Sequence, residues 1–358
     1  MADTITEDAI TELTHGMPVE IGKIDRELKR LWKEGQGVAT RASLINFAVY
    51  CEGGDAMRES TELISQFTRD HACRAILICL DPQTPGAGVQ ACISAHCHLS
   101  RAGAKQICCE QISFLLGREG QGLIPNIVFT HLDSDLPLVL WWRCDWPTEC
   151  EEQLWTWVDR LLYDSQVWQH PAEQFRLLRE CIVPASPRMA LCDLNWTRSL
   201  YMRQAVAQIF DHPEYLEELA SLDGAEIVYG PGMRSTAILM AGWLAAQLGW
   251  KLQGPDPAGP RFTNRAGGPV QVALREEAGR ALGSVRLKAG AASFLVAHHE
   301  GSSYLHADIT LPGNRESHYL MPGDKGDLVA LLNDELMSGG KHKVYLKAVS
   351  MIEPVIGK

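Results

Sequence analysis

The sequence lacks the positive charge that binds nucleic acids and anionic membranes. Its 33 Lys and Arg residues are outnumbered by 44 Asp and Glu residues, which gives a formal net charge of −11 at pH 7. Those partners are bound chiefly by Lys and Arg on phosphate, so we expect neither nucleic-acid nor membrane binding. With 46% hydrophobic and 22% charged residues in 358, the composition is typical of a globular, cytoplasmic protein.

Long hydrophobic runs are also scarce. The longest apolar stretch, residues 236–248, is interrupted and too short to span a bilayer. The first eight residues are acidic and include no basic segment ahead of an apolar one, so a secretory signal is not expected. The sequence therefore predicts no membrane segment.

Cysteine is absent from the last part of the chain. All eleven cysteines lie between Cys51 and Cys192, and an odd number in a secreted protein would leave one thiol without a partner. Reduced, buried cysteines in a cytosolic domain are therefore favoured. His96 and His98 share a predicted strand face and could share a metal, but no second ligand pair with zinc-site spacing accompanies them, so no metal is expected.

Familiar catalytic motifs are missing. The sequence has no Gly-x-Ser-x-Gly elbow, no His-Glu-x-x-His, no kinase set and no zinc-deaminase signature. The glycines of residues 117–122 fall in the wrong order for a dinucleotide fingerprint, which favours a plain turn. These absences lower the expectation of an enzyme without excluding one, and they indicate no cofactor.

What the sequence does contain is an alternation of strand-like and helix-like segments. This alternation predicts an α/β domain with a largely parallel sheet flanked by helices, followed by a smaller α+β unit with an antiparallel meander. The expected strands are 44–51, 74–80, 90–99, 106–116, 136–142, 226–229, 270–274, 284–288, 293–297, 304–311 and 343–348. The expected helices are 19–34, 57–70, 122–132, 151–162, 172–181, 197–210, 215–222, 235–248 and 324–337.

A Pro/Gly cluster at residues 254–260 suggests a boundary, because it can continue neither a helix nor a central strand. We therefore expect an N-terminal extension with a helix over 1–40, the α/β domain over 41–252, and the C-terminal α+β domain over 253–358.

The predicted strand 136–142 ends in a Trp pair between two charged residues, Asp135 and Arg143. Its short apolar run is typical of a strand buried on both faces of a parallel sheet. Adjacent strand residues point to opposite faces, so we expect one of Trp141 and Trp142 in the core and the other available.

Residues 193–203 have the pattern of an anchored helix start. Asp193 or Asn195 is placed near the first turn, and Arg198 and Arg203 follow on neighbouring flanks, where they could pair with Asp135 or Asp193. One interpretation is an internal ion-pair network. The other is a surface on which Trp196, Arg198 and Arg203 meet a partner, because Trp and Arg most often anchor interfaces.

Residues 230–236 link a short strand to an apolar helix. Ser235 or Thr236 could cap that helix, and Arg234 lies beside its positive end. The segment lacks the Gly-Lys-Ser/Thr ending of a P-loop. Capping is the favoured interpretation, and an anion site formed by Arg234, Ser235 and Thr236 is the alternative.

Five segments in order give the chain a resemblance to a known family: residues 73–82, 109–113, 135–142, 193–198 and 234–244. Together they resemble the OpcA family, the glucose-6-phosphate dehydrogenase assembly proteins of cyanobacteria, actinobacteria and related bacteria. The resemblance runs from about residue 40 to the C-terminus. It also implies a thioredoxin-regulated cysteine pair near the C-terminus, which this sequence lacks.

The resemblance implies a non-catalytic partner that binds glucose-6-phosphate dehydrogenase and activates it allosterically, supporting the oxidative pentose phosphate pathway and NADPH supply. Such a partner must favour one state of the enzyme over another. The residues expected at or behind the interface are Asp135, Trp142, Arg143, Trp196, Arg198 and Arg203. The alternative function is an enzyme or sensor that binds a sugar phosphate or nucleotide through residues 230–236.

Overall fold

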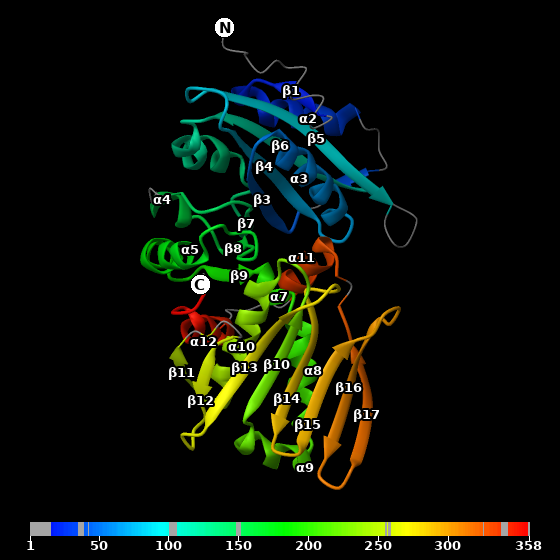
Figure 1. Cartoon of the computed structure of the whole chain (residues 1–358). Helices are drawn as coiled ribbons and strands as arrows, with labels where there is room; N and C mark the ends of the chain where they lie inside the picture. Colours follow the sequence, from blue (N-terminus) through cyan, green and yellow to red (C-terminus); the bar gives the residue numbers. More distant parts are fainter. Residues whose placement is uncertain are drawn as a thin grey trace. The chain divides into compact units, whose positions relative to one another are not determined.

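Two sheets organise the chain, and each belongs to a unit of its own (Figure 1). One unit comprises Met1–Tyr163 and Arg176–Leu191, and the other comprises Asp164–Phe175 and Cys192–Lys358. The computed structural model describes residues 16–34, 39–41, 43–99, 106–147, 152–254, 256, 259–324, 326–337 and 343–356.

The first unit is built on a sheet whose strand order is β1-β5-β6-β4-β3-β7-β8-β9, with β2 beside β6. The pairs β3–β4, β4–β6, β3–β7, β7–β8 and β2–β6 are parallel, whereas β1–β5 and β5–β6 are antiparallel. The largely parallel sheet is thus confirmed. Its strands are β1 (Met17–Val19), β2 (Ala39–Arg41), β3 (Ile45–Glu52), β4 (Cys73–Asp81), β5 (Val89–Leu99), β6 (Gln106–Gly117), β7 (Leu138–Trp142), β8 (Arg160–Tyr163) and β9 (Ala190–Asp193).

Helices flank this sheet because its central strands are apolar on both faces. Val49 and Tyr50 are neighbours on β3 and point to opposite faces, yet neither is exposed. Helix α3 packs on β3 and β4 through a stripe that includes Met57, Ile64 and Phe67. The helical segments are η1 (Ile21–Lys23), α2 (Ile24–Glu34), α3 (Gly54–Phe67), η2 (Gln121–Leu123), η3 (Ile124–Val128), η4 (Phe129–His131), α4 (Glu152–Trp155), α5 (Pro171–Leu177), η5 (Leu178–Ile182) and α6 (Val183–Ala185).

Two expectations for this part of the chain need revision. The helix expected over 151–162 is wrong, since only α4 is helical and β8 follows it to extend the parallel sheet beside β7. The helix expected near 122–132 forms as the short segments η2 to η4. The helix of the expected N-terminal extension is present as α2, whereas residues 1–15 and 35–38 lie outside the described part of the chain.

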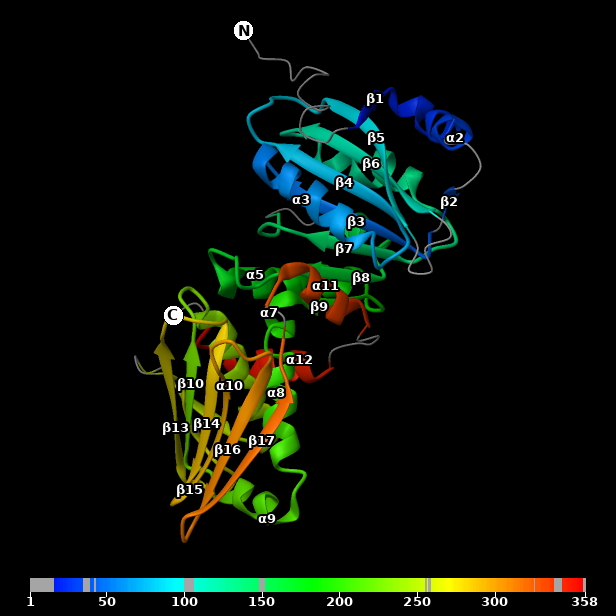
Figure 2. The ribbon, with the colours of Figure 1, turned by 90° about the vertical axis from the view of Figure 1, so that its right-hand side faces the viewer.

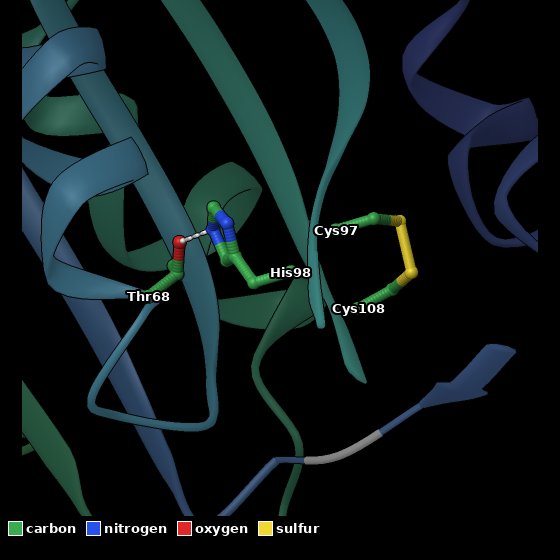
Figure 3. The surroundings of a disulfide bond; sticks show 4 residues. All are labelled: Thr68, Cys97, His98 and Cys108. Carbon is green, nitrogen blue, oxygen red and sulfur yellow. Dashed lines mark hydrogen bonds between the residues drawn. A yellow bond between two sulfur atoms is a disulfide. The ribbon is translucent and has the colours of Figure 1, made fainter. Parts of the chain in front are cut away.

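A disulfide bond joins Cys97 on β5 to Cys108 on β6, so the expectation of reduced cysteines is wrong at this pair (Figure 3). The antiparallel register places these two residues directly opposite each other, with their Cα atoms 4.1 Å apart. His98 projects from the other face of β5, and its Nε2 lies 3.2 Å from the Thr68 hydroxyl. The alternation of faces expected along this strand is confirmed.

The second unit contains an eight-stranded sheet in the order β11-β12-β13-β10-β14-β15-β16-β17. Only β10–β13 is a parallel pair among them, and β14 to β17 form the expected antiparallel meander. Helices α8 and α10 lie on the same side of this sheet (Figure 2). The strands are β10 (Gly224–Tyr229), β11 (Lys251–Gly254), β12 (Arg261–Thr263), β13 (Pro269–Glu276), β14 (Leu282–Ala289), β15 (Ala292–His298), β16 (Tyr304–Leu311) and β17 (Arg315–Pro322).

Helix α10 is the buried centre of the second unit. Residues 236–245 are buried without interruption, which is why its sequence is apolar on every side. It packs closely on α12, because a Cβ at Gly242 would lie 2.6 Å from the carbonyl oxygen of Ala348. The helical segments are α7 (Leu194–Thr197), α8 (Leu200–Ile209), α9 (Pro213–Leu216), η6 (Glu217–Ser221), α10 (Arg234–Leu248), α11 (Leu328–Met337) and α12 (Lys343–Ile352).

The boundary between the two units does not lie at residue 252, where the sequence predicted it. Strand β10, expected in the first domain, pairs with β13 and β14, so residues on both sides of 252 belong to one sheet. The Pro/Gly stretch 254–260 connects the antiparallel neighbours β11 and β12 and is not a boundary. The strand expected over 343–348 is wrong as well, because α12 buries Tyr345, Ala348 and Ile352 at helical spacing.

Candidate functional site

The Trp pair of β7 lies in the core of the first unit. Trp141 and Trp142 are each only 2% exposed, so the expectation that one of them is available is wrong. The Trp142 ring stacks on Tyr50 with centroids 3.8 Å apart, and the rings of Trp146 and Trp155 lie within 6.0 Å. Because both faces of β7 are covered, Trp142 supports the fold and is not itself a contact surface.

Arg143 ties the end of β7 to helix α3. Its guanidinium lies 4.8 Å from the Trp141 ring centroid, forms an ion pair with Glu59 at 2.8 Å and donates to the Ser60 hydroxyl at 2.5 Å. The side chain is 13% exposed. Asp135, in contrast, is exposed in the turn before β7 and makes no hydrogen bond or ion pair within the described ranges.

In the second unit, Trp196 and Arg203 form a stacked pair. Asp193 begins α7 by accepting from the Asn195 backbone N–H, as expected, and this turn places Trp196 beside α8. The Arg203 guanidinium carbon lies 3.5 Å from the Trp196 ring centroid, and its nitrogens donate to Trp196 O and Ser199 Oγ. Burial lowers the pKa of Arg203 to about 9, and the charge of Glu335 offsets only part of this effect.

A cavity of about 520 Å³ opens beside this pair. We call it the Trp196 cavity; its wall includes Trp196, Thr197, Arg203, Trp243, Glu335 and Val344. Glu335 is 1% exposed and accepts a hydrogen bond from the Thr197 hydroxyl at 2.5 Å. The cavity wall therefore contains both a buried carboxylate and the guanidinium of Arg203. Val344 is 43% exposed, and helices α11 and α12 also expose Met337 and Leu346, at 80% and 51%.

Arg198 does not pair with Asp135 or Asp193 as expected. It forms a bidentate ion pair with Asp164, at 2.7 and 2.6 Å, and both side chains are largely buried. Burial alone would lower the pKa of Arg198, but the hydrogen bonds and charge of Asp164 outweigh it and raise that pKa. The internal ion-pair interpretation therefore describes this residue.

The hydroxyl groups at the start of α10 are used inside the unit. Met233 is the N-cap of α10 and no side chain caps it, so the expectation that Ser235 or Thr236 caps this helix is wrong. Ser235 Oγ accepts from the Asn195 amide, and Thr236 Oγ1 donates to the carbonyl oxygen of the same amide. Arg234 is half-buried at the first position of the helix, and an anion site here stays a prediction.

Four polar residues form hydrogen bonds or ion pairs with the predicted site residues or their neighbours: Asp193, Asn195, Asp164 and Glu335. The sequence patterns point to only the first two of them. The partners Asp164 and Glu335 lie 34 and 138 residues from Arg198 and Thr197 along the chain. In the described ranges no group of three or more His, Cys, Asp or Glu is placed to hold a metal ion. The described helices are all too short or too polar to cross a membrane.

Comparison with known proteins gives matches over both units. Residues 65–180 match the family model described as the glucose-6-phosphate dehydrogenase subunit N-terminal domain, and residues 189–349 match that of the C-terminal domain. A protein of Synechocystis sp. named OxPP cycle protein OpcA is 26% identical over 195 residues, covering 54% of this chain and 40% of that protein. A protein of the same name from Synechococcus elongatus is 26% identical over 226 residues, covering 59% and 49%. The chain thus spans about half the length or less of these relatives.

Among solved structures, an aldose-aldose oxidoreductase from Caulobacter crescentus aligns with a TM-score of 0.46 at 10% identity, covering 86% of this chain and 96% of that one. A dehydrogenase (MviM) from Clostridium difficile aligns with a TM-score of 0.42 at 10% identity, covering 87% and 98%. Likenesses this distant carry no argument about function. The two family models follow each other along the sequence and together cover most of it, and the chain belongs to the OpcA family.

Proposed function

We propose that this protein is a non-catalytic, cytoplasmic partner of glucose-6-phosphate dehydrogenase that activates the enzyme allosterically and so supports NADPH supply by the oxidative pentose phosphate pathway. The observation that carries the proposal is the match of both units to domains of a glucose-6-phosphate dehydrogenase subunit. The names of the two cyanobacterial relatives, which refer to the OxPP cycle, agree with it. The proposal requires no cofactor.

Activation requires that the protein bind one state of the dehydrogenase more tightly than another. A tenfold preference corresponds to a coupling free energy of about 1.4 kcal/mol. An interface of moderate size supplies such a difference without any chemistry by the activator itself.

The direct test is to add the purified full-length chain to the dehydrogenase of the same organism. We expect a saturable rise in kcat/KM for glucose 6-phosphate, together with a complex in analytical ultracentrifugation. A complex without a change in rate would leave an assembly role and exclude activation, whereas no complex at micromolar concentrations would contradict the proposal.

We place the docking surface at the rim of the Trp196 cavity. Of the residues first expected to touch the partner, only Asp135 is exposed. Trp196 and Arg203, however, line a cavity whose wall also includes Val344, which is 43% exposed. An exposed apolar side chain beside a fixed aromatic and guanidinium pair matches the anatomy of protein interfaces. We propose that Trp196 and Arg203 shape the surface from below and that Val344 makes the apolar contact.

A charged substitution in the cavity wall separates docking from folding. Val344→Asp puts a carboxylate where the partner would bury a valine side chain, and we expect the Kd to rise at least tenfold. Leu216→Asp on α9 is the matched control, because Leu216 is similarly exposed, at 54%, and belongs to the same unit. Equal effects of the two substitutions on the Kd would contradict docking at the Trp196 cavity.

A further inference from the structure

A second cavity of the second unit lies apart from the Trp196 cavity. It has a volume of about 1180 Å³ and is formed by the end of β10, the turns 277–283 and 298–303, and residues Gly323 and Asp324. Ligand sites commonly have volumes of 300–1,000 Å³, so this space admits a small metabolite. We call it the Arg280 cavity.

Three side chains in the wall of the Arg280 cavity are linked through one carboxylate. Asp324 Oδ1 accepts from Arg280 Nη1 at 3.0 Å, and Asp324 Oδ2 lies 3.2 Å from His298 Nε2. Burial works against the charged form of Asp324, but the contacts with His298 and Arg280 outweigh it and lower the pKa of this carboxyl. The Arg280 side chain is 39% exposed, so part of its guanidinium still faces solvent.

His298 is not fully satisfied by this arrangement. Its side chain is 9% exposed, and its Nδ1 is buried without a hydrogen-bond partner in the described residues. A buried polar atom of this kind is usually satisfied by a ligand or an ordered water. His298 is one of the residues that line the Arg280 cavity.

The rest of the wall offers both donors and acceptors. Ser303 contributes a hydroxyl, and Glu277 and Glu300 contribute carboxylates, whereas the Ser302 hydroxyl is used by the backbone of Tyr304. Since Asp324 is neutralised by Arg280, the two glutamates leave the wall negative, although Arg275 Nη2 lies 4.0 Å from Glu277 and offsets part of that charge. A phosphate dianion would be repelled here, whereas a hydroxyl can donate to the carboxylates and accept from the guanidinium.

From this geometry we propose that the Arg280 cavity binds an uncharged, polyhydroxylated ligand of the sugar or polyol class. Arg280 and the unsatisfied His298 contact ligand oxygens, and the two glutamates accept from ligand hydroxyls. This inference goes beyond the proposed function, because it assigns a small-molecule site to the chain itself and needs no dehydrogenase.

The test uses the full chain alone, titrated by calorimetry with a panel of unmodified hexoses, pentoses and polyols, their phosphate esters and their aldonic acids, each to 20 mM. We expect saturable binding of at least one uncharged member, weakened at least tenfold by Arg280→Ala and by Glu300→Gln. Lys288→Ala, an exposed residue of β14 outside the cavity, is the control and should bind as the native chain does.

A further variant tests the role of the two carboxylates in excluding phosphate. The double variant E277Q/E300Q removes the two carboxylates, and we expect it to bind phosphate esters more tightly than the native chain does. Since Glu300 is exposed, E300Q alone keeps the test valid if Arg280→Ala fails to fold. Binding only of phosphate esters or aldonates by the native chain, or no binding by any member, would overturn the proposal. Neither result bears on the dehydrogenase, which is absent from the titration.

Discussion

Asp193 should make the stability of this protein fall as the pH rises from about 4 to about 7. Burial, followed by the charge of Asp164, raises the pKa of Asp193 from the ordinary 3.8 to about 7 in the folded chain. The protonated form is therefore favoured by folding. Its contribution is fully present below pH 3.8, where both states are protonated, and is lost as the pH rises through about 7.

The magnitude follows from the size of the shift. At 1.36 kcal/mol per pKa unit, a rise from 3.8 to about 7 corresponds to about 4 kcal/mol of unfolding free energy. Four donors surround the carboxylate: the backbone N–H groups of Ser165 and Asn195, and the hydroxyls of Ser165 and Tyr345. The hydrogen bonds from Ser165 and Tyr345 lower the pKa, and the rise to about 7 is the effect of burial that remains after them.

The variant Asp193→Asn isolates this group. Its Oδ1 still accepts from the two backbone N–H groups, and its amide can donate to the hydroxyls of Ser165 and Tyr345, so it imitates the protonated acid. Urea unfolding at a series of pH values should show a slope for the native chain that the variant lacks. Parallel slopes for the two proteins between pH 4 and 7 would refute the reasoning and mean that Asp193 is ionised throughout.

Three further predictions concern the first unit. Arg143→Ala should lower the unfolding free energy of this unit by about 1–3 kcal/mol in urea unfolding, without changing affinity for the dehydrogenase. Weaker binding of the dehydrogenase with unchanged stability would show that Arg143 contacts the partner. Trp142→Ala should cost about 3–5 kcal/mol, because it empties a fully covered core site, and a smaller loss in thermal unfolding would show that the site collapses. Cys97→Ser removes the disulfide bond to Cys108, 11 residues away, and should cost about 2–3 kcal/mol of unfolding free energy in urea without reductant; an unchanged free energy would contradict a stabilising role of this bond.

Local patterns predicted most of the first sheet and the meander of the second. Strands such as β4 are continuous apolar runs, and α3 repeats its buried residues every three or four positions, so each carries its own signal. The apolar segment at α12 is short. Its residues Val344, Tyr345 and Leu346 are compatible with both the helical and the strand period. Burial of Tyr345 and Ala348 against α10 decides in favour of a helix.

The boundary and the site depended on contacts distant in sequence. The partners of β10 lie some 50 residues downstream, and no local feature of that strand indicates them. Likewise the sequence singles out Arg198 and Trp142, but their spacing cannot reveal that Asp164 neutralises the first or that Trp155 covers the second. The same residue types that anchor interfaces here anchor the interiors of the two units.

The measurement that tests the central claim most directly is the affinity of the full chain for glucose-6-phosphate dehydrogenase, determined by calorimetry for the native protein, Val344→Asp and Leu216→Asp. We expect Val344→Asp to bind at least tenfold more weakly and to shift the activation curve by the same factor, while Leu216→Asp matches the native chain. Equal affinities for all three proteins would contradict docking at the Trp196 cavity, and no measurable binding by the native chain would contradict the partnership itself.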